Sequence, residues 1–100
     1  ASNPMPAKVT NIYTTPAETE ISVNWNPVDD LDLKDYAVWI STNANLDPLD
    51  VPPSWTGTAL ATVFKGLPTT TIHYVWVCAR DIWKPGNWRI SDRYQVTTGS

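Results

Sequence analysis

The sequence of 100 residues contains very little cysteine, histidine and glycine, and few basic side chains. Its single cysteine, Cys78, excludes a disulfide within the chain, and its single histidine excludes a zinc site built from several Cys or His ligands. Seven Lys and Arg, scattered among ten Asp and Glu, give a net charge of -3. A surface that binds nucleic-acid phosphates needs clustered positive charge, so we expect no nucleic acid as a partner.

Long apolar runs are also absent, and this limits what the chain does at a membrane. No stretch approaches the roughly 20 apolar residues that cross a bilayer, and no basic-then-apolar leader opens the sequence. We therefore expect no membrane insertion and a soluble fragment without a signal peptide.

Motifs of catalysis are missing too. There is no Gly-x-Ser-x-Gly turn, and the single histidine leaves no pair of nucleophile and base. Four carboxylates, Asp29, Asp30, Asp32 and Asp35, lie close together and could attract calcium, but they lack the glycine-bearing ligand order of a dedicated calcium loop. A solvated acidic turn is the favoured interpretation, so we expect no enzyme, no metal and no cofactor.

What the sequence does contain is alternation typical of β-strands. Polar and apolar residues alternate within short segments that end at Pro, Gly, Asn or Asp. The expected strands lie near residues 8–13, 19–27, 35–41, 58–66, 72–81 and 93–98. Turn signals between alternating strands favour two antiparallel sheets that bury one face each against the other. The sequence therefore predicts one all-β domain over residues 1–100, a two-sheet antiparallel sandwich without helices, whose ordered core spans about residues 6–98.

The segment 72–81, "IHYVWVCARD", shows two apolar faces. Successive side chains of a strand point to opposite sides of the sheet. One side carries His73, Val75, Val77 and Ala79, and the other carries Tyr74, Trp76, Cys78 and Arg80. The small β-branched set fits the interior, so the bulky aromatic set is expected on the outside. Cys78 is expected to be a small apolar filler on that face.

Segment 35–41 follows the same pattern, and a long loop comes after it. Tyr36, Val38 and Ile40 are expected to point inward, whereas Trp39 points outward. Residues 42–57 contain several prolines and turn-forming Asn and Asp, so no regular strand can run far there. A loop of this length usually carries a function or a short strand of its own.

Together these segments resemble a fibronectin type III domain, a seven-stranded, immunoglobulin-like sandwich without disulfides. The resemblance covers Pro6 to Thr98 and depends on "ISVNWNP" with an inward Trp25, "DYAVWI" with Tyr36, Leu67, and "VWVCARD" with Ala79. The stretches "DLDLKDY", "WVCARD" and "GNW" further resemble the fibronectin type III modules of tail-tip host-specificity proteins in bacteriophages and prophages. This resemblance implies a module of a larger protein that does no chemistry itself.

One position departs from the family pattern. The family has a tyrosine six residues after the loop leucine and six before the alanine, and both counts lead to His73. Either His73 replaces this tyrosine and binds backbone through a ring nitrogen, or a bulge shifts the register and Tyr74 takes the role. The agreement of the two counts favours His73.

In this fold the third, sixth and seventh strands share a sheet, so Trp39, Tyr74 and Trp76 are expected to form an aromatic patch on its outer side. Several parts of the chain or partners could cover this patch. The stems of Arg80, Arg93 or Lys65 could lie over the rings, or loop 42–57 could fold across them with Trp55 as its anchor. A neighbouring domain or a glycan could also bind there.

Two further tryptophans, Trp83 and Trp88, flank Lys84–Asn87 in the last connecting loop. A stiff turn there presents rings at the end of the sandwich, with Trp83 as the better candidate for exposure and Trp88 for capping the core. The candidate interaction surface is Trp39, Tyr74, Trp76, Trp83 and Trp88.

Two functions remain open at this point. The first is a non-catalytic interaction or spacer module of a larger multidomain protein, extracellular or in a virion, whose partners are neighbouring domains or another protein. The second is a carbohydrate-binding accessory module of a secreted glycan-degrading enzyme, in which exposed tryptophans stack on sugar rings.

Overall fold

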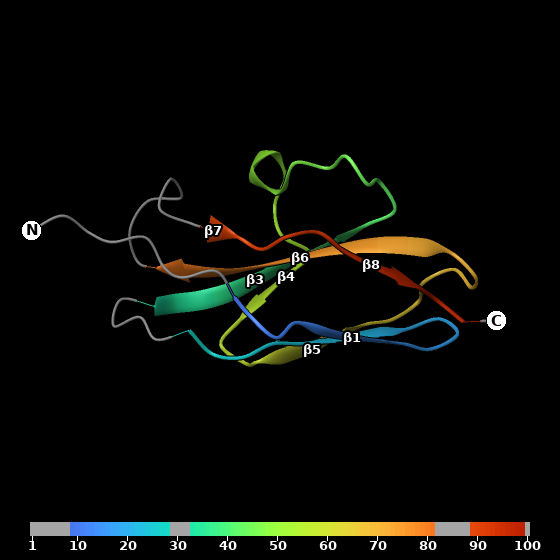
Figure 1. Cartoon of the computed structure of the whole chain (residues 1–100), viewed down its shortest axis with the longest axis horizontal. Coiled ribbons are helices and arrows are strands. Elements are labelled where there is room, and N and C mark those ends of the chain that lie inside the picture. Colours follow the sequence, from blue (N-terminus) through green and yellow to red (C-terminus); the bar gives the residue numbers. More distant parts are fainter. Residues whose placement is uncertain (1–8, 29–32, 82–88, 100) are drawn as a thin grey trace, which may run out of the picture.

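The computed structural model describes residues 9–28, 33–81 and 89–99, which form a sandwich of two antiparallel sheets (Figure 1). The strands, in chain order, are β1 Tyr13–Pro16, β2 Ile21–Asn24, β3 Leu33–Ser41, β4 Trp55–Gly57, β5 Ala61–Phe64, β6 Ile72–Asp81, β7 Arg89–Ile90 and β8 Tyr94–Thr97. One sheet has the order β1-β2-β5, and the other has the order β4-β3-β6-β7 with β8 also paired to β6. The predicted all-β, disulfide-free sandwich is confirmed.

The core lies between the sheets, where the inward sides of β2, β3, β6 and β8 meet. Its buried residues are Val9, Ile21, Val23, Trp25, Tyr36, Val38, Val75, Val77, Ala79 and Val96. Those in β2, β3 and β6 lie on the side of the strand that the alternation assigns to the interior, because a period of two allows only one side of a strand to face the other sheet. The hydroxyl of Tyr36 also accepts a hydrogen bond from the N–H of Val28, 3.1 Å away.

The first strand was expected near residues 8–13, and this expectation is wrong by several residues. Strand β1 begins only at Tyr13 and ends at Pro16. Asn11 has a φ of 54°, in the left-handed region that no strand residue adopts. Asparagine tolerates this conformation better than most residues, so the chain bends there before the strand begins.

The long loop contains the short strand that its length suggested. Residues Pro48–Asp50 form a single 3₁₀ turn, η1, in which the side chain of Asp47 accepts a hydrogen bond from the N–H of Leu49. Strand β4 follows and pairs with β3. The ring of Trp55 lies over Gly57, where an added Cβ would come within 2.7 Å of a ring carbon. A glycine is therefore needed for this side chain to reach the core, where it contacts Trp25 edge-on with ring centroids 5.7 Å apart.

The last strand is broken into two pieces. Strand β7 pairs with the end of β6 and β8 with its beginning. At the break, the N–H of Ser91 donates to the carbonyl of Val77, and the N–H of Val77 donates to the hydroxyl of Ser91, both over 2.9 Å. A side-chain oxygen thus replaces the backbone carbonyl that a continuous strand would supply.

Candidate interaction surface

The outer face of β3 and β6 brings the predicted aromatic residues together. In the antiparallel pairing of these strands, Trp39 lies directly opposite Trp76, and Ala37 lies opposite Cys78. These four residues form a second buried cluster, on the side of the sheet away from the main core, with Tyr74 and Ile90 partly buried against it. The predicted direction of all three aromatic side chains is therefore confirmed.

The structure decides between the possible covers of this face, because both tryptophans are buried. Trp39 is 1% exposed and Trp76 is 6% exposed. The cover is the segment 42–53, here called the strap, which includes η1 and passes over this face of the sheet (Figure 1). Leu46 of the strap contacts the cluster, and the indole N–H of Trp39 donates to the carbonyl of Val51 over 3.1 Å. The alternative in which the loop folds across the rings is therefore the correct one.

Trp55 does not anchor this cover, contrary to expectation. Its ring belongs to the main core beside Trp25, on the other face of the sheet. The residue that takes the expected role is Leu46. It is the only large apolar residue in the first half of the loop, "TNANLDP", and this was the signal in the sequence that could have identified it.

Arg93 ties the strap to the rest of the sheet. Its guanidinium lies 5.0 Å from the ring centroid of Tyr74, a cation–π contact, and it donates to the carbonyl of Ala44 over 2.7 Å. At the other end of the strap, the N–H of Ser54 donates to the carbonyl of Val38 over 2.8 Å. The strap is therefore held to the sheet at both ends as well as in its middle.

The strap presents two apolar side chains to solvent in place of the tryptophans. Leu49 is 60% exposed and Val51 is 36% exposed. They flank the exposed Asp50 within a segment that also contains Pro48, Pro52 and Pro53. The accessible part of this face thus includes these two aliphatic side chains, the carboxylates of Asp47 and Asp50, and the half-buried ring of Tyr74.

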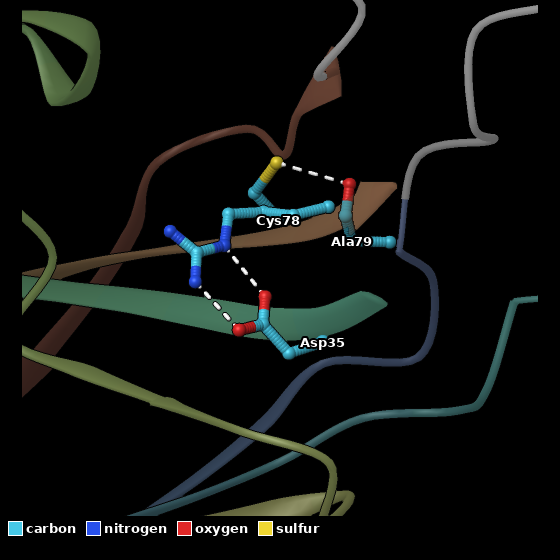
Figure 2. Close-up of polar contacts among 4 residues, drawn as sticks. Asp35, Cys78 and Ala79 are labelled. Carbon is cyan, nitrogen blue, oxygen red and sulfur yellow. Dashed lines mark hydrogen bonds and ion pairs between the residues drawn. The ribbon is translucent and has the colours of Figure 1, made fainter. Parts of the chain in front are cut away.

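Arg80 and Asp35 form an ion pair on the same face of the sheet, beside Cys78 (Figure 2). The guanidinium donates two hydrogen bonds to the carboxylate, each 2.6 Å long, and the side chains are only 13% and 15% exposed. Hydrogen bonding to Asp35 raises the pKa of Arg80 above the ordinary arginine value, burial opposes this shift, and the negative charge of Asp35 adds to it. Asp35 is thus engaged in an ion pair that joins β3 to β6.

The structure also distinguishes between His73 and Tyr74 at the position of the family tyrosine. The His73 side chain is 3% exposed on the inner face of β6, and Nδ1 lies 3.0 Å from the carbonyl oxygen of Thr71. A carbonyl only accepts, so Nδ1 carries the proton and donates this bond. Tyr74 lies on the opposite face, without a shift of register. His73 therefore occupies the position expected for the family tyrosine and binds backbone through a ring nitrogen.

Several sequence-based expectations fall on residues outside the described parts. These residues are Trp83, Trp88, Asp29, Asp30 and Asp32. Within residues 9–28, 33–81 and 89–99, no group of three or more His, Cys, Asp or Glu side chains is placed to hold a metal ion. The same ranges contain no pocket and no helix long and apolar enough to cross a membrane.

Comparison with known proteins gives matches in structure only. No protein-family model matches the sequence, and no curated protein matches it. Among solved structures, the sixth fibronectin type III domain of human fibronectin type III domain containing protein 3 is 18% identical with a TM-score of 0.79, over 99% of this chain and 91% of that one. At this identity the likeness shows the fold, and the chain has the fibronectin type III fold.

Two other similar structures are longer than this chain. A structure of the chicken CNTN1 FN1–FN3 domains is 17% identical with a TM-score of 0.75, and the match covers 94% of this chain and 32% of that one. The spore cortex lytic enzyme SleM of Clostridium perfringens is 20% identical with a TM-score of 0.64, over 96% of this chain and 29% of that one. The chain thus spans about a third of each of these neighbours, which contain the fold as one part of a longer polypeptide.

Proposed function

We propose that residues 1–100 form one non-catalytic interaction and spacer module of a larger multidomain protein, in an extracellular or phage tail apparatus for host recognition. The observation that carries the spacer role is the position of the two ends of the described sandwich. The carbonyl of Thr10 accepts from Asn26, just beyond one end of β2, whereas Gly99 donates to Ala17, just beyond the other end. Segments joined before and after the domain would leave it at opposite ends.

The separation between these ends is large enough for a spacer. Strand β2 and its flanking residues run along the sheet from Glu20, which is bonded to Ala17, to Asn26, which is bonded to Thr10. At about 3.3 Å per residue, the two ends lie roughly 20 Å apart. The module would hold its neighbours apart by this length, and the fold also occurs as one part of longer chains such as the chicken CNTN1 FN1–FN3 domains.

The proposed interaction surface is the outer face of β3 and β6 together with the last connecting loop. Tyr74 and the strap residues Leu49 and Val51 are accessible on that face. Trp39 and Trp76 are not accessible themselves, but the strap that presents these side chains packs on their cluster and is bonded to Trp39. Trp83 and Trp88 would extend the surface at the end of the sandwich.

The test is titration of the domain with the purified segments that flank it in its parent polypeptide, monitored through NMR shifts of the amides of Leu49, Val51 and Tyr74. Saturable shifts in these residues, abolished by Leu49→Ser with Val51→Ser, support docking on this face. Thr15→Val, on the outer face of the other sheet, is the matched control and should leave binding unchanged. Shifts confined to the other sheet would reject the proposed surface.

The second candidate is a carbohydrate-binding accessory module, favoured by the likeness to one part of a spore cortex lytic enzyme. Stacking on a sugar needs an exposed ring face, and the burial of Trp39 and Trp76 leaves Trp83 as the main candidate. Titration with polysaccharides, monitored through tryptophan fluorescence, distinguishes the two functions. Saturable quenching that Trp83→Ala removes would favour carbohydrate binding over the spacer module.

A further inference from the structure

The end of the chain is bound between two turns after its last strand has finished. Gly99 lies beyond β8, yet its N–H donates to the carbonyl of Ala17 over 2.7 Å, and its carbonyl accepts from the N–H of Thr70 over 3.1 Å. Ala17 belongs to the turn between β1 and β2, and Thr70 to the turn before β6. The N–H of Gly99 is therefore bonded to the turn between β1 and β2, and its carbonyl to the turn before β6.

Thr98 adds a second set of bonds and is 2% exposed. Its hydroxyl accepts from the N–H of Thr71 over 2.9 Å and donates to the carbonyl of Pro68 over 2.7 Å. Its own N–H donates to the carbonyl of Thr71 over 3.1 Å. A side chain with this role needs a hydroxyl that both accepts and donates, which valine of the same shape does not have.

His73 reinforces the same turn from inside the sandwich. Its Nδ1 donates to the carbonyl of Thr71, which is the oxygen that also accepts from Thr98. The neighbouring Thr70 has a φ of 51°, a left-handed conformation that is unfavourable for a β-branched residue. Such a conformation persists when surrounding bonds determine it, and here the N–H of Thr70 is held by Gly99.

We propose that these contacts form an exit clamp, made by Thr98 and Gly99 with turn residues Ala17 and 68–71, which fixes the direction in which the chain leaves the sandwich. The domain is then a rigid spacer that sets the orientation of the next segment, and Thr98 is its main positioning residue. This inference rests on the proposed function, since it needs a segment that continues the chain.

The first test is amide hydrogen exchange of the chain itself, measured by NMR. The amides of Thr70, Thr98 and Gly99 are expected to exchange as slowly as that of Val77 in the core. Thr98→Val should raise the exchange rates of Thr70 and Gly99 at least tenfold more than that of Val77. Thr98→Ser keeps the hydroxyl and should restore protection, while Thr97→Val, an exposed neighbour, is the matched control.

Two results of this measurement would overturn the clamp. One is rapid exchange of Gly99 in the unaltered chain, because the exit would then fray. The other is an equal rise at Val77 and Gly99 in Thr98→Val, because Thr98 would then support the whole sandwich and not the exit in particular.

The second test measures whether the clamp orients the segment joined to Ser100. Two copies joined end to end, with one spin label on each, should give a narrow distance distribution that Thr98→Val broadens and Thr98→Ser does not. A broad distribution in the unaltered tandem would overturn the inference. If the distribution is narrow but deleting this domain leaves the activity of the parent protein unchanged, the exit clamp is supported and the spacer function is rejected.

Discussion

Single side chains in this sandwich make hydrogen bonds at places where the strand backbone cannot. Ser91 supplies an acceptor for Val77 at the break in the last strand, and Thr98 supplies both a donor and an acceptor at the exit. His73 donates to the carbonyl of Thr71. Buried backbone groups are costly to leave unpaired, so these three polar residues have structural roles that hydrophobicity does not reveal.

Ser91→Ala tests this view at the break between β7 and β8. The variant leaves the buried N–H of Val77 without its acceptor, so we expect the free energy of unfolding to fall by about 1–3 kcal/mol. Urea unfolding monitored by circular dichroism measures it. Ser22→Ala, on the outer face of β2, should change stability by less than about 0.5 kcal/mol. Equal effects of the two substitutions would contradict this role of Ser91.

Among the described residues, Asn11 and Thr70 are the two non-glycine residues with positive φ, and they allow a reciprocal experiment. Thr70→Asn places a residue that tolerates the left-handed region where a β-branched one now lies, and should raise the free energy of unfolding by about 1 kcal/mol. Asn11→Thr makes the opposite change at a φ of 54° and should lower it by a similar amount. Thermal unfolding of both variants checks the two signs. A stabilising Asn11→Thr would show that these backbone angles are not strained.

The Arg80–Asp35 pair is expected to contribute to stability because it is bidentate and mostly withdrawn from water. Asp35→Asn should lower the free energy of unfolding by about 1.5–3 kcal/mol, the usual range for hydrogen bonds to charged groups. A double-mutant cycle with Arg80→Met isolates the coupling between the two side chains. Additive single effects would mean that the pair contributes nothing.

The pH dependence of this pair is determined by the direction of the Arg80 shift. A base whose pKa is raised on folding contributes its stability in full below the unfolded-state pKa and loses it only as the pH rises through the folded-state value. Both values lie at or above the ordinary arginine pKa, far above neutral pH. Between pH 7 and about 10, the coupling in the double-mutant cycle should therefore not decline through loss of the arginine proton.

At the scale of elements, the strap decides which side chains of the sheet reach solvent. Leu46→Ala removes its apolar contact with the tryptophan cluster, so the indole N–H of Trp39 should exchange with solvent at least tenfold faster. NMR of the indole protons measures this rate. Leu49→Ala removes the same side chain from an exposed position of the strap and should leave the rate unchanged. A response to Leu49→Ala alone would mean that the contacts are misassigned.

Strand faces were predictable from the sequence, whereas the cover over the outer face was not. The side that each residue of 72–81 faces is set by alternation, and every inward assignment of His73, Val75, Val77 and Ala79 agrees with their burial. For Trp39 and Trp76 the sequence left several covers open, because the strap has no periodicity from which its path can be read. Its position depends on specific bonds to Val51, Ala44 and Val38.

Strand boundaries were harder to predict where one residue interrupts the pattern. Asn11 delays the start of β1 through its backbone conformation, and Ser91 breaks the last strand while its hydroxyl keeps a bond to β6. Neither residue changes the alternation of apolar side chains around it. Hydrophobic patterning therefore predicts the sheets and their core, but not these irregularities.

For the molecule as a whole, the buried Cys78 thiol reports on global opening. The residue has no exposed surface and belongs to the buried cluster that contains Trp39 and Trp76. A thiol reagent such as DTNB should react with it only when the sandwich unfolds, so its rate should rise with urea in proportion to the unfolded population. Complete reaction within seconds in native buffer would contradict this. Reducing agents should leave Tm unchanged, because one cysteine forms no disulfide within the chain.

The positions of Thr10 and Gly99 also determine how the molecule would respond to tension. A pull applied through the two ends acts along β1 and β8, since the chain enters at one end of the sheets and leaves at the other. Antiparallel hydrogen bonds are perpendicular to their strands, so this force shears the β8–β6 bonds together instead of opening them one by one. The sandwich is thus oriented to bear a mechanical load lengthwise.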